Sequence, residues 1–187
     1  MCGIIGEYRF DKKIIDKIIF KQKLDSIKHR GPDGDGIWSN EKCMLGHVRL
    51  SIIDLSSSGA QPMISSKKNI INYNGELFNF KLLKKRIKKT IKFKGKSDTE
   101  VLLNLIDSFD FNILNDLIGM FAFAYYNQTN DELTLVRDQL GIKPLYYHFN
   151  KNRIIFGSEI KTILLDEEYK KIGRAHVWTP VTRSSRM

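Results

Sequence analysis

The second residue of the chain, Cys2, carries a side chain that could act as a nucleophile. If Met1 is removed, which the small Cys side chain favours, the mature chain begins with a thiol and a free α-amine on one residue. A thiol becomes a strong nucleophile when a base takes its proton, and an α-amine with a pKa near ~8 is such a base. Gly3 and Gly6 allow close backbone approach around it. The alternative is a structural cysteine buried at the start of an edge strand.

Four further stretches combine polar side chains with turn-forming residues. The loop at 29–36 holds a histidine, an arginine and two aspartates among glycines and a proline, and loops of this kind often carry function. Arg49 and Asn74-Gly75-Glu76 each follow an apolar run, and Asp98 follows a serine. Each also has a purely structural alternative. Arg49 could form a surface ion pair, Asn74–Glu76 a hairpin turn, and Asp98 a helix N-cap.

The composition fits one globular domain with or without a tail, because 42% of the 187 residues are hydrophobic and 11% are aromatic. No run of 18 apolar residues and no signal-peptide core occurs, so we expect no membrane span and no secretion. Two cysteines are too few for a disulfide framework, and a reducing cytoplasm is the expected location. The net charge of +10 owes much to lysines in 81–96. Because no binding motif accompanies them, we favour a solvated face or a partner surface over nucleic-acid binding.

Hydrophobic periodicity divides the chain into strands and helices. A helix at 14–27 is expected to bury a stripe of Ile14, Ile18, Leu24 and Ile27 and to expose its lysines. Because strands occur in adjacent pairs with helices between the blocks, the pattern predicts an α+β fold with two largely antiparallel sheets. The expected strands are 3–10, 36–38, 43–48, 70–73, 120–126, 133–137, 145–149 and 153–156, and the other expected helices are 80–93, 101–109, 113–118 and 158–166.

The end of the chain differs in composition from the rest. No lysine occurs after Lys171, whereas three of the nine arginines do. Residues 173–183 show neither helical nor strand periodicity, and they resemble translated sequencing-adapter DNA. We therefore predict one domain over 2–166, the start of a linker at 167–171, and a non-native tail at 172–187.

Eight motifs follow one another along the chain, and together they are far more specific than any one alone. They are Cys2-Gly3-Ile4-Ile5-Gly6, His29-Arg30-Gly31-Pro32-Asp33, Arg49-Leu50-Ser51-Ile52-Ile53-Asp54, Asn74-Gly75-Glu76, Ser97-Asp98-Thr99-Glu100, Gly119-Met120-Phe121-Ala122-Phe123, Arg137-Asp138 with Gly141-Ile142-Lys143-Pro144-Leu145-Tyr146-Tyr147, and Ser158-Glu159-Ile160-Lys161. Over nearly all of 2–166 the chain closely resembles the N-terminal glutaminase domain of glutamine-hydrolysing asparagine synthetase. That domain is a class II glutamine amidotransferase of the N-terminal-nucleophile (Ntn) hydrolase fold. The resemblance therefore implies a four-layer αββα sandwich.

The resemblance also implies a reaction, the hydrolysis of glutamine to glutamate and ammonia. Cys2 would attack the amide, and its own α-amine would serve as the general base and then as the acid that protonates the departing ammonia. Asn74 would donate its side-chain amide, and Gly75 its backbone N–H, to the oxyanion of the tetrahedral intermediate. No metal-ligand spacing is present, and this hydrolysis needs neither a metal nor a cofactor.

Binding residues follow from the same resemblance. Arg49 would hold the α-carboxylate of glutamine, since a planar guanidinium matches that group. Asp98, helped by Glu76, would hold the α-ammonium group. The remaining pocket wall would be the backbone of Leu50, Ser51, Ile52 and Ile53.

The expected partners are L-glutamine and the C-terminal synthetase domain of a longer parent chain, with a homodimer left open and no membrane or nucleic acid. That domain would use ATP and Mg²⁺ to convert aspartate into asparagine, releasing AMP and pyrophosphate. Its pyrophosphate-binding Ser-Gly-Gly-x-Asp-Ser loop does not occur in this chain. We therefore expect this chain alone to catalyse only the glutaminase half-reaction.

Three alternatives stay open at this point. The chain could serve a related amidotransferase whose acceptor is a sugar acid or another carboxylate, because the acceptor would bind outside this chain. It could belong to the sister families of glucosamine-phosphate synthase or the purine amidotransferase, which we rank lower because their loops differ at 30–33 and 49–54. It could also be a degenerate scaffold that only binds a partner, although the presence of Cys2 argues against this.

Overall fold

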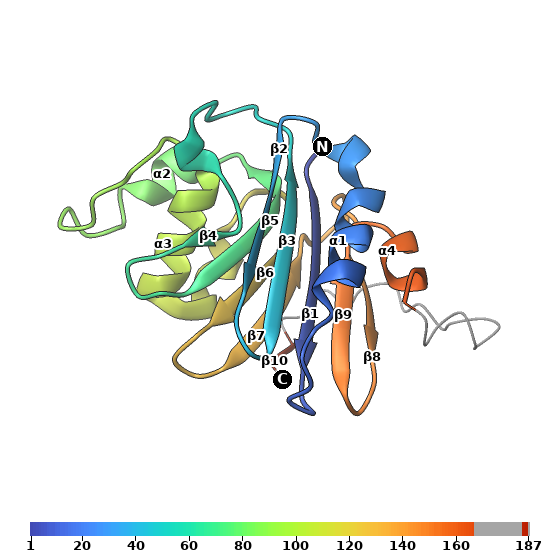
Figure 1. Ribbon diagram of the computed structural model, residues 1–187. Coiled ribbons are helices and arrows are strands. Elements are labelled where there is room, and N and C mark those ends of the chain that lie inside the picture. The colour runs from blue at the N-terminus through green and yellow to red at the C-terminus, as the bar shows by residue number, and fades with distance from the viewer. Residues whose placement is uncertain (167–184, 187) are drawn as a thin grey trace.

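The computed structural model describes residues 1–166 and 185–186 (Figure 1). All eight predicted strands are present, and two short strands, β4 and β10, are additional. The predictions for residues 167–184 and 187 lie outside the described residues. The strands are β1 (Gly3–Arg9), β2 (Gly34–Ser39), β3 (Cys43–Arg49), β4 (Met63–Ile64), β5 (Ile70–Leu77), β6 (Gly119–Asn127), β7 (Glu132–Arg137), β8 (Tyr146–Phe149), β9 (Arg153–Gly157) and β10 (Ser185–Arg186).

These strands form two antiparallel sheets. The first sheet has the order β2-β3-β1-β9-β8, and the second has the order β10-β7-β6-β5-β4. Every pairing between these strands is antiparallel, as the adjacent strand pairs in the sequence predict.

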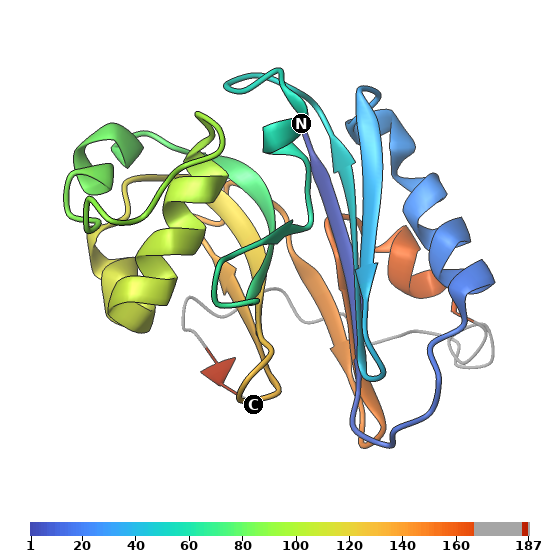
Figure 2. The ribbon, with the colours of Figure 1, turned by 60° about the vertical axis from the view of Figure 1, so that its left-hand side comes forward.

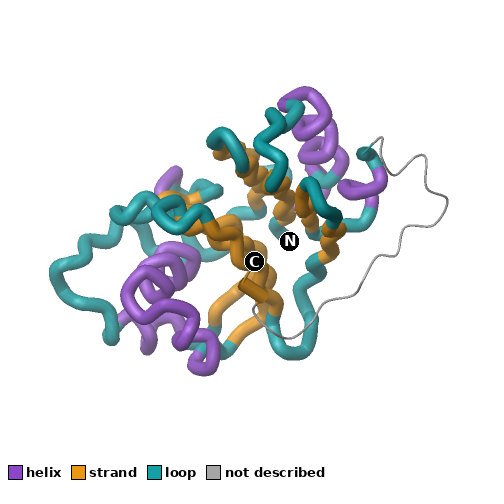
Figure 3. The backbone as a smooth tube through the Cα atoms, turned by 90° about the horizontal axis from the view of Figure 1, so that it is seen from below, coloured by secondary structure: helices purple, strands orange, loops and turns teal. Residues whose placement is uncertain are grey.

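Helices cover the outer face of each sheet, which gives four layers (Figure 2, Figure 3). Helices α1 (Lys17–Ser26) and α4 (Lys161–Leu164) lie on the first sheet, and α2 (Phe80–Lys84) and α3 (Asp98–Phe109) lie on the second. Three short 3₁₀ helices, η1 (Lys28–Arg30), η2 (Ser57–Gly59) and η3 (Asp110–Asp116), complete the described elements. The predicted α+β, four-layer αββα sandwich is confirmed.

Strand alternation explains how the first sheet fills two layers of core. Ile4 of β1 packs between the two sheets, in a cluster with Phe156 of β9. The next residue, Ile5, points to the opposite face and packs against Phe20 and Leu24 of α1. Both faces of β1 are therefore buried, and the residues before it are held at a fixed place in the sandwich.

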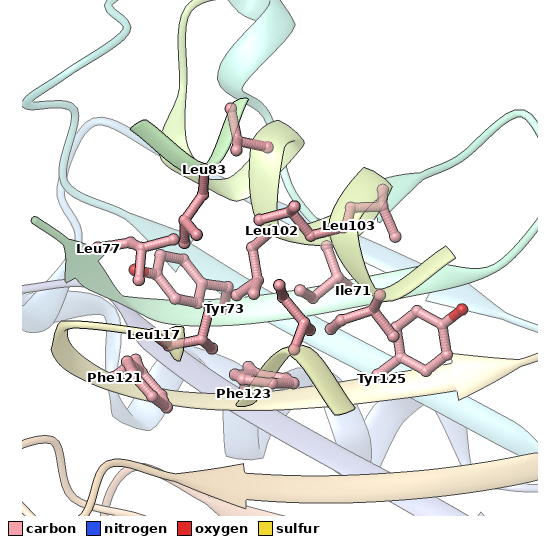
Figure 4. Packing of buried hydrophobic residues seen from close by; sticks show 14 of the residues in the cluster. Ile71, Tyr73, Leu77, Leu83, Leu102, Leu103, Leu117, Phe121, Phe123 and Tyr125 are labelled. Carbon is pink, nitrogen blue, oxygen red and sulfur yellow. The ribbon is translucent and has the colours of Figure 1, made fainter. Parts of the chain in front are cut away.

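Helix α3 begins at Asp98, three residues before the predicted start at 101. The Ser97 hydroxyl accepts a hydrogen bond from the Glu100 N–H at 3.2 Å and caps the helix. The buried face of α3, with Leu102 and Leu103, packs in one cluster with Tyr73 of β5 and Phe123 of β6 (Figure 4). This packing holds the start of α3 beside β5.

Strand β5 runs through Asn74-Gly75-Glu76 and ends at Leu77, so the hairpin-turn alternative for this stretch is wrong. These three residues pair with β6 in unbroken register. A Cβ atom at Gly75 would lie 2.6 Å from the Met120 carbonyl oxygen, so the pairing there requires glycine. The three residues thus lie on a rigid strand rather than on a loop.

Several helix predictions are wrong in their extent. The helix expected at 158–166 spans only α4, Lys161–Leu164, and the one expected at 113–118 is the 3₁₀ helix η3, Asp110–Asp116. Helix α1 begins only at Lys17, because the Asp16 carboxylate caps it by accepting from the N–H groups of Ile18 and Ile19 at 2.8 and 3.0 Å. Ile14 and Ile18 are consequently exposed, at 89% and 73%, rather than part of a buried stripe. Helix α2 ends at Lys84 instead of 93. The region from 81 to 96 contains nine cationic residues and no acidic one, and their mutual repulsion disfavours a longer helix.

A buried ionic cluster ties α1 to the first sheet. Lys23, expected on the exposed face of its helix, is only 2% exposed. Its Nζ lies 2.7 Å from the Asp166 carboxylate and 3.8 Å from that of Glu7 in β1. Arg153 of β9 bridges the same two carboxylates at 3.0 and 2.7 Å. The cluster fixes both the helix and the end of the described domain to β1.

We expect Lys23→Met to destabilise the fold by about 3 kcal/mol, because it removes one member of a buried ion pair and leaves two carboxylates with fewer partners. The matched control is Lys21→Met, whose half-exposed ammonium pairs with Asp25 and Asp35 and should cost less than about 1 kcal/mol. Urea denaturation monitored by circular dichroism measures both. Equal losses in the two variants would contradict the assignment of Lys23 to the core.

Candidate active site

A cleft of about 200 Å³ opens where β1, β3 and β5 meet the loop after β3. All ten residues predicted from the sequence to form a site line this cleft, although they come from four separate parts of the chain. They are Cys2, Arg49, Leu50, Ser51, Ile52, Ile53, Asn74, Gly75, Glu76 and Asp98. The structure thus brings the predicted residues together, and their individual roles stay predictions.

The Cys2 residue is held at both its side chain and its backbone. Its Sγ accepts a hydrogen bond from the Leu50 N–H at 3.3 Å and lies 3.5 Å from the Leu50 carbonyl oxygen. The Arg30 Nε donates to the Cys2 carbonyl oxygen at 3.1 Å, and Arg30 is in turn paired with Glu159 at 3.1 Å. The loop at 29–36 therefore shapes the site through Arg30.

The surroundings of the thiol favour its protonated form. Burial raises the pKa of Cys2, while the Leu50 N–H, the positive N-terminus and Arg49 act in the opposite direction without cancelling the rise. The thiol needs a base to become a nucleophile at neutral pH. Among the described residues no histidine lines the cleft, so a Cys–His pair does not supply that base.

Asn74 presents a hydrogen-bond donor to the cleft. Its side chain is 1% exposed, and its Nδ2 has no hydrogen-bond partner among the described residues. Two residues earlier, the Asn72 Nδ2 donates to the carbonyls of Ile5 and Gly46, so this face of β5 looks toward the first sheet. A buried donor left unpaired costs about 1–3 kcal/mol, and an acceptor on a bound ligand would recover that cost.

Arg49 at the end of β3 forms no surface ion pair in the described part of the chain. Its guanidinium donates to the backbone carbonyls of Asp54 and Ser56, the latter at 2.9 Å. These bonds hold the loop after β3 around the cleft. The other N–H groups of the Arg49 guanidinium could donate to a bound ligand. The ion-pair alternative is therefore wrong.

Asp98 is the first residue of α3, and the N-cap is Ser97, so the capping alternative for Asp98 is also wrong. Its carboxylate accepts hydrogen bonds at 2.9 Å from the Tyr73 hydroxyl, the Leu77 N–H and the Thr99 N–H. Burial raises the pKa of Asp98, against the effect of these donors. Glu76 is half-buried within β5, so it is a strand residue rather than a turn residue.

Sequence reasoning did not assign two buried polar residues of the cleft. Gln61, 9% exposed, pairs with the backbone of Tyr73. Lys143, 6% exposed, places its Nζ 3.2 Å from the Met1 Sδ. Gln61 lies in an irregular polar stretch without periodicity, so the sequence contains no local signal for it. Lys143 belongs to the motif from Gly141 to Tyr147, and that motif is the sequence signal that could have identified it.

In the part of the chain that the structure describes, no group of three or more His, Cys, Asp or Glu residues is placed to hold a metal ion. The search of the same residues for a helix long and apolar enough to span a membrane finds none.

The two-sheet sandwich with a cysteine leading into β1 defines an amidotransferase of the N-terminal-nucleophile class. The chain belongs to the family of the glutamine amidotransferase domain, whose family model matches residues 1–178. It is similar to the putative glutamine-hydrolysing asparagine synthetase 2 of Methanocaldococcus jannaschii, with 38% identity over 91% of this chain and 36% of that protein. It is also similar to amidase chry2 of Gibberella zeae, with 38% identity over 82% of this chain and 23% of that protein.

A solved structure confirms the fold. Glutamine phosphoribosylpyrophosphate amidotransferase from Bacillus subtilis superposes with a TM-score of 0.74 at 24% identity, over 88% of this chain and 43% of that one. The predicted Ntn fold and membership of the glutamine amidotransferase family are both confirmed. The chain spans about a third or less of the length of the curated relatives described here.

We expect stability to fall in acid because of His47, which lies fully buried beside the cleft. Burial lowers the pKa of His47 to about 4. Between pH ~6.5 and 4 the unfolded chain therefore takes up a proton that the folded chain refuses, so the free energy of unfolding decreases as pH falls, by up to about 1.4 kcal/mol per pH unit. Urea denaturation at pH 7 and 4.5 measures this loss.

The variant His47→Gln retains an amide donor toward the Tyr73 carbonyl oxygen, which the His47 Nε2 contacts at 3.2 Å. It should show a smaller loss of stability between the two pH values than the wild type. The control His29→Gln, at an exposed ring, should lose as much stability as the wild type. If the stability of His47→Gln depended on pH as the wild type does, His47 would not be the cause of the acid loss of stability.

Proposed function

We propose that this chain is the glutamine-hydrolysing half of an ATP-dependent asparagine synthetase. The observation that carries the proposal is the cleft itself, in which the buried, unpaired Asn74 amide and the Cys2 thiol share one lining. A nucleophile that needs a base and a donor that needs an acceptor are the two groups that amide hydrolysis by acyl transfer requires.

The reaction begins on mature Cys2, after Met1 is removed. The α-amine takes the thiol proton as Sγ attacks the side-chain amide carbon of glutamine. Negative charge then develops on the former carbonyl oxygen, where the Asn74 Nδ2 and the Gly75 N–H stabilise it, and one such donor is worth about 3 kcal/mol of barrier. The C–N bond breaks as the α-ammonium returns the proton to nitrogen, which leaves as ammonia. Water hydrolyses the resulting thioester, releasing glutamate and restoring the thiol.

Substrate binding uses other residues that line the same cleft. The Arg49 fork holds the α-carboxylate of glutamine, and the Asp98 carboxylate holds its α-ammonium with help from Glu76. The backbone of Leu50 to Ile53 completes the wall. Asp98 suits this role because its three protein donors fix its position while it still lines the cleft.

The acceptor of the ammonia binds outside this chain. We propose a C-terminal synthetase domain in the longer parent, with ATP and Mg²⁺ as its cofactors and aspartate as its substrate, on the strength of the similarity to asparagine synthetases. The glutaminase half itself uses neither cofactor. The similarity to a protein named amidase chry2 supports the alternative that the parent amidates another carboxylate. A cytoplasmic location and a homodimer remain predictions.

The Cys2 chemistry predicts that the purified chain lacks Met1 by intact mass and releases glutamate from glutamine. Cys2→Ala should abolish the release, and Cys2→Ser should nearly abolish it, because a hydroxyl is a weaker nucleophile than a thiol. The matched control Cys43→Ala changes the other cysteine, which is buried in the core, and should keep the activity. A wild-type rate that survives in Cys2→Ala would overturn the proposed mechanism.

Two adjacent residues separate binding from capping. Asp98→Asn should raise the KM for glutamine at least tenfold, because it removes the charge that faces the substrate ammonium. Ser97→Ala should leave KM near the wild-type value and cost about 1 kcal/mol of stability through the lost cap. Steady-state glutaminase kinetics and thermal melts of both variants measure these effects. An unchanged KM in Asp98→Asn would exclude Asp98 from substrate binding.

A further inference from the structure

The edge of β5 that faces the cleft is only partly covered by a neighbouring strand. β4 pairs with β5 at two positions, Met63 with Ile71 and Ile64 with Ile70. On its other edge β5 pairs with β6 along its whole length, from Ile70 to Leu77. In the described part of the chain, the edge beyond Ile71 is therefore left without a strand partner.

Two side chains take the place of the missing strand. The Gln61 Oε1 accepts from the Tyr73 N–H at 2.7 Å, and the Gln61 Nε2 donates to the Tyr73 carbonyl oxygen at 3.1 Å. A neighbouring antiparallel residue would make the same two bonds. Four residues further along, the Leu77 N–H donates to the Asp98 carboxylate at 2.9 Å.

Gly75 lies midway between these two anchored positions. Backbone N–H groups of alternate residues in a strand point to the same edge. Because the N–H groups of Tyr73 and Leu77 point to side chains on the cleft edge, the Gly75 N–H faces that edge as well. The two anchored residues, Tyr73 and Leu77, thus lie on either side of Asn74 and Gly75. In the proposed function, the Asn74 side chain and the Gly75 N–H stabilise the oxyanion.

We propose that Gln61 is a positioning residue, which holds Asn74 and Gly75 in the geometry of the oxyanion site by substituting for a strand at Tyr73. This inference rests on the proposed glutaminase function. A real strand in this place would cover the Gly75 N–H and fill the cleft. A side chain anchors the edge at one residue and leaves the next outward-facing residue open.

Gln61 is itself well placed to act as an anchor. Its side chain is buried, with only 9% of the residue exposed. Its Nε2 also lies 3.4 Å from the Thr99 hydroxyl at the start of α3. The Tyr73 carbonyl oxygen receives a second contact from the His47 Nε2 at 3.2 Å, and the Tyr73 hydroxyl donates to Asp98. Tyr73 is therefore held by Gln61, His47 and Asp98, and among the described residues Gln61 alone contacts both the Tyr73 N–H and the Tyr73 carbonyl oxygen.

The decisive test compares Gln61→Glu and Gln61→Met with Gln128→Glu and Gln128→Met, which change an exposed glutamine in a turn far from the cleft. Gln61→Glu keeps an acceptor for the Tyr73 N–H but opposes the Tyr73 carbonyl oxygen with a carboxylate, and Gln61→Met loses both bonds. We expect kcat for glutamine hydrolysis to fall about 10- to 100-fold in both, less than the 10²–10³ caused by deleting an oxyanion donor. KM should change less than about threefold, and the Gln128 variants should match the wild type.

A second measurement is the coupling between Gln61 and Asn74 in kcat. A merely structural role of Gln61 would not produce such coupling. In an Asn74→Ala background, Gln61→Met should lower kcat by a smaller factor than it does in the wild-type chain, because one of the two donors that Gln61 positions is already gone. The rate of Cys2 alkylation by iodoacetamide should stay at the wild-type value in the Gln61 variants, because the nucleophile is not disturbed. Full additivity with Asn74→Ala, or folded Gln61 variants with wild-type kcat, would overturn the proposal.

Hydrogen exchange on the wild-type chain covers the case in which neither Gln61 variant folds. The Tyr73 amide should then exchange as slowly as the β5 amides bonded to β6, and fast exchange would overturn the proposal. A wild-type chain that lacks Cys2-dependent glutaminase activity would instead refute the proposed function. The experiments therefore distinguish failure of the positioning role of Gln61 from failure of the proposed glutaminase function.

Discussion

The site depends on a pair of hydrogen bonds that join the two sheets. The Asn72 side chain of β5 crosses the sandwich and donates to the Ile5 carbonyl of β1 at 3.1 Å and to the Gly46 carbonyl of β3 at 2.9 Å. These bonds lie two residues from Asn74 on one strand and three from Cys2 on the other. They fix the distance between β1, which directly follows the proposed nucleophile, and β5, which carries the proposed oxyanion donors. The cleft can then have a set width before any substrate arrives.

Preorganisation of this kind has a cost in stability. The Asn74 Nδ2, the His47 Nδ1 and the Asn72 Oδ1 are buried and have no partner among the described residues. All three belong to strands that border the cleft, whereas the buried ionic cluster around Lys23 lies on the other side of the first sheet and is paired throughout. Three of the five buried side-chain atoms that lack a partner among the described residues thus lie on strands beside the cleft. A fourth belongs to Arg30, which contacts Cys2, and the fifth, the Asp107 Oδ2, lies in α3.

The sequence predicted the strands well, for physical reasons, and the residues predicted for the site lie in one cleft. Strands such as β1 and β6 alternate or run apolar between turn residues, so their positions follow from local pattern. Cys2, Asn74 and Asp98 belong to motifs whose order along the chain is specific, and the fold brings them into one cleft. The turn alternative for Asn74 is wrong because its stretch pairs with β6 around Met120, which is distant in the sequence. The cap alternative for Asp98 is wrong because the adjacent Ser97 caps the helix instead.

The predictions that were wrong or absent also have specific physical causes. Ile14 and Ile18 continue a helical stripe, but the Asp16 cap starts α1 after Ile14 and turns Ile18 to solvent. Lys23 is buried because two carboxylates from distant segments surround it, which local periodicity does not encode. Gln61 has no sequence signal at all, because its partner is a backbone position that only the arrangement of β4 and β5 leaves open.

The central claim concerns where the reacting oxygen sits, and a crystal structure of the chain alkylated by a chloroketone analogue of glutamine tests it most directly. We expect a thioether on the Cys2 Sγ, with the ketone oxygen within about 3 Å of both the Asn74 Nδ2 and the Gly75 nitrogen. An adduct on another residue, or a Cys2 adduct whose oxygen points away from β5, would contradict it.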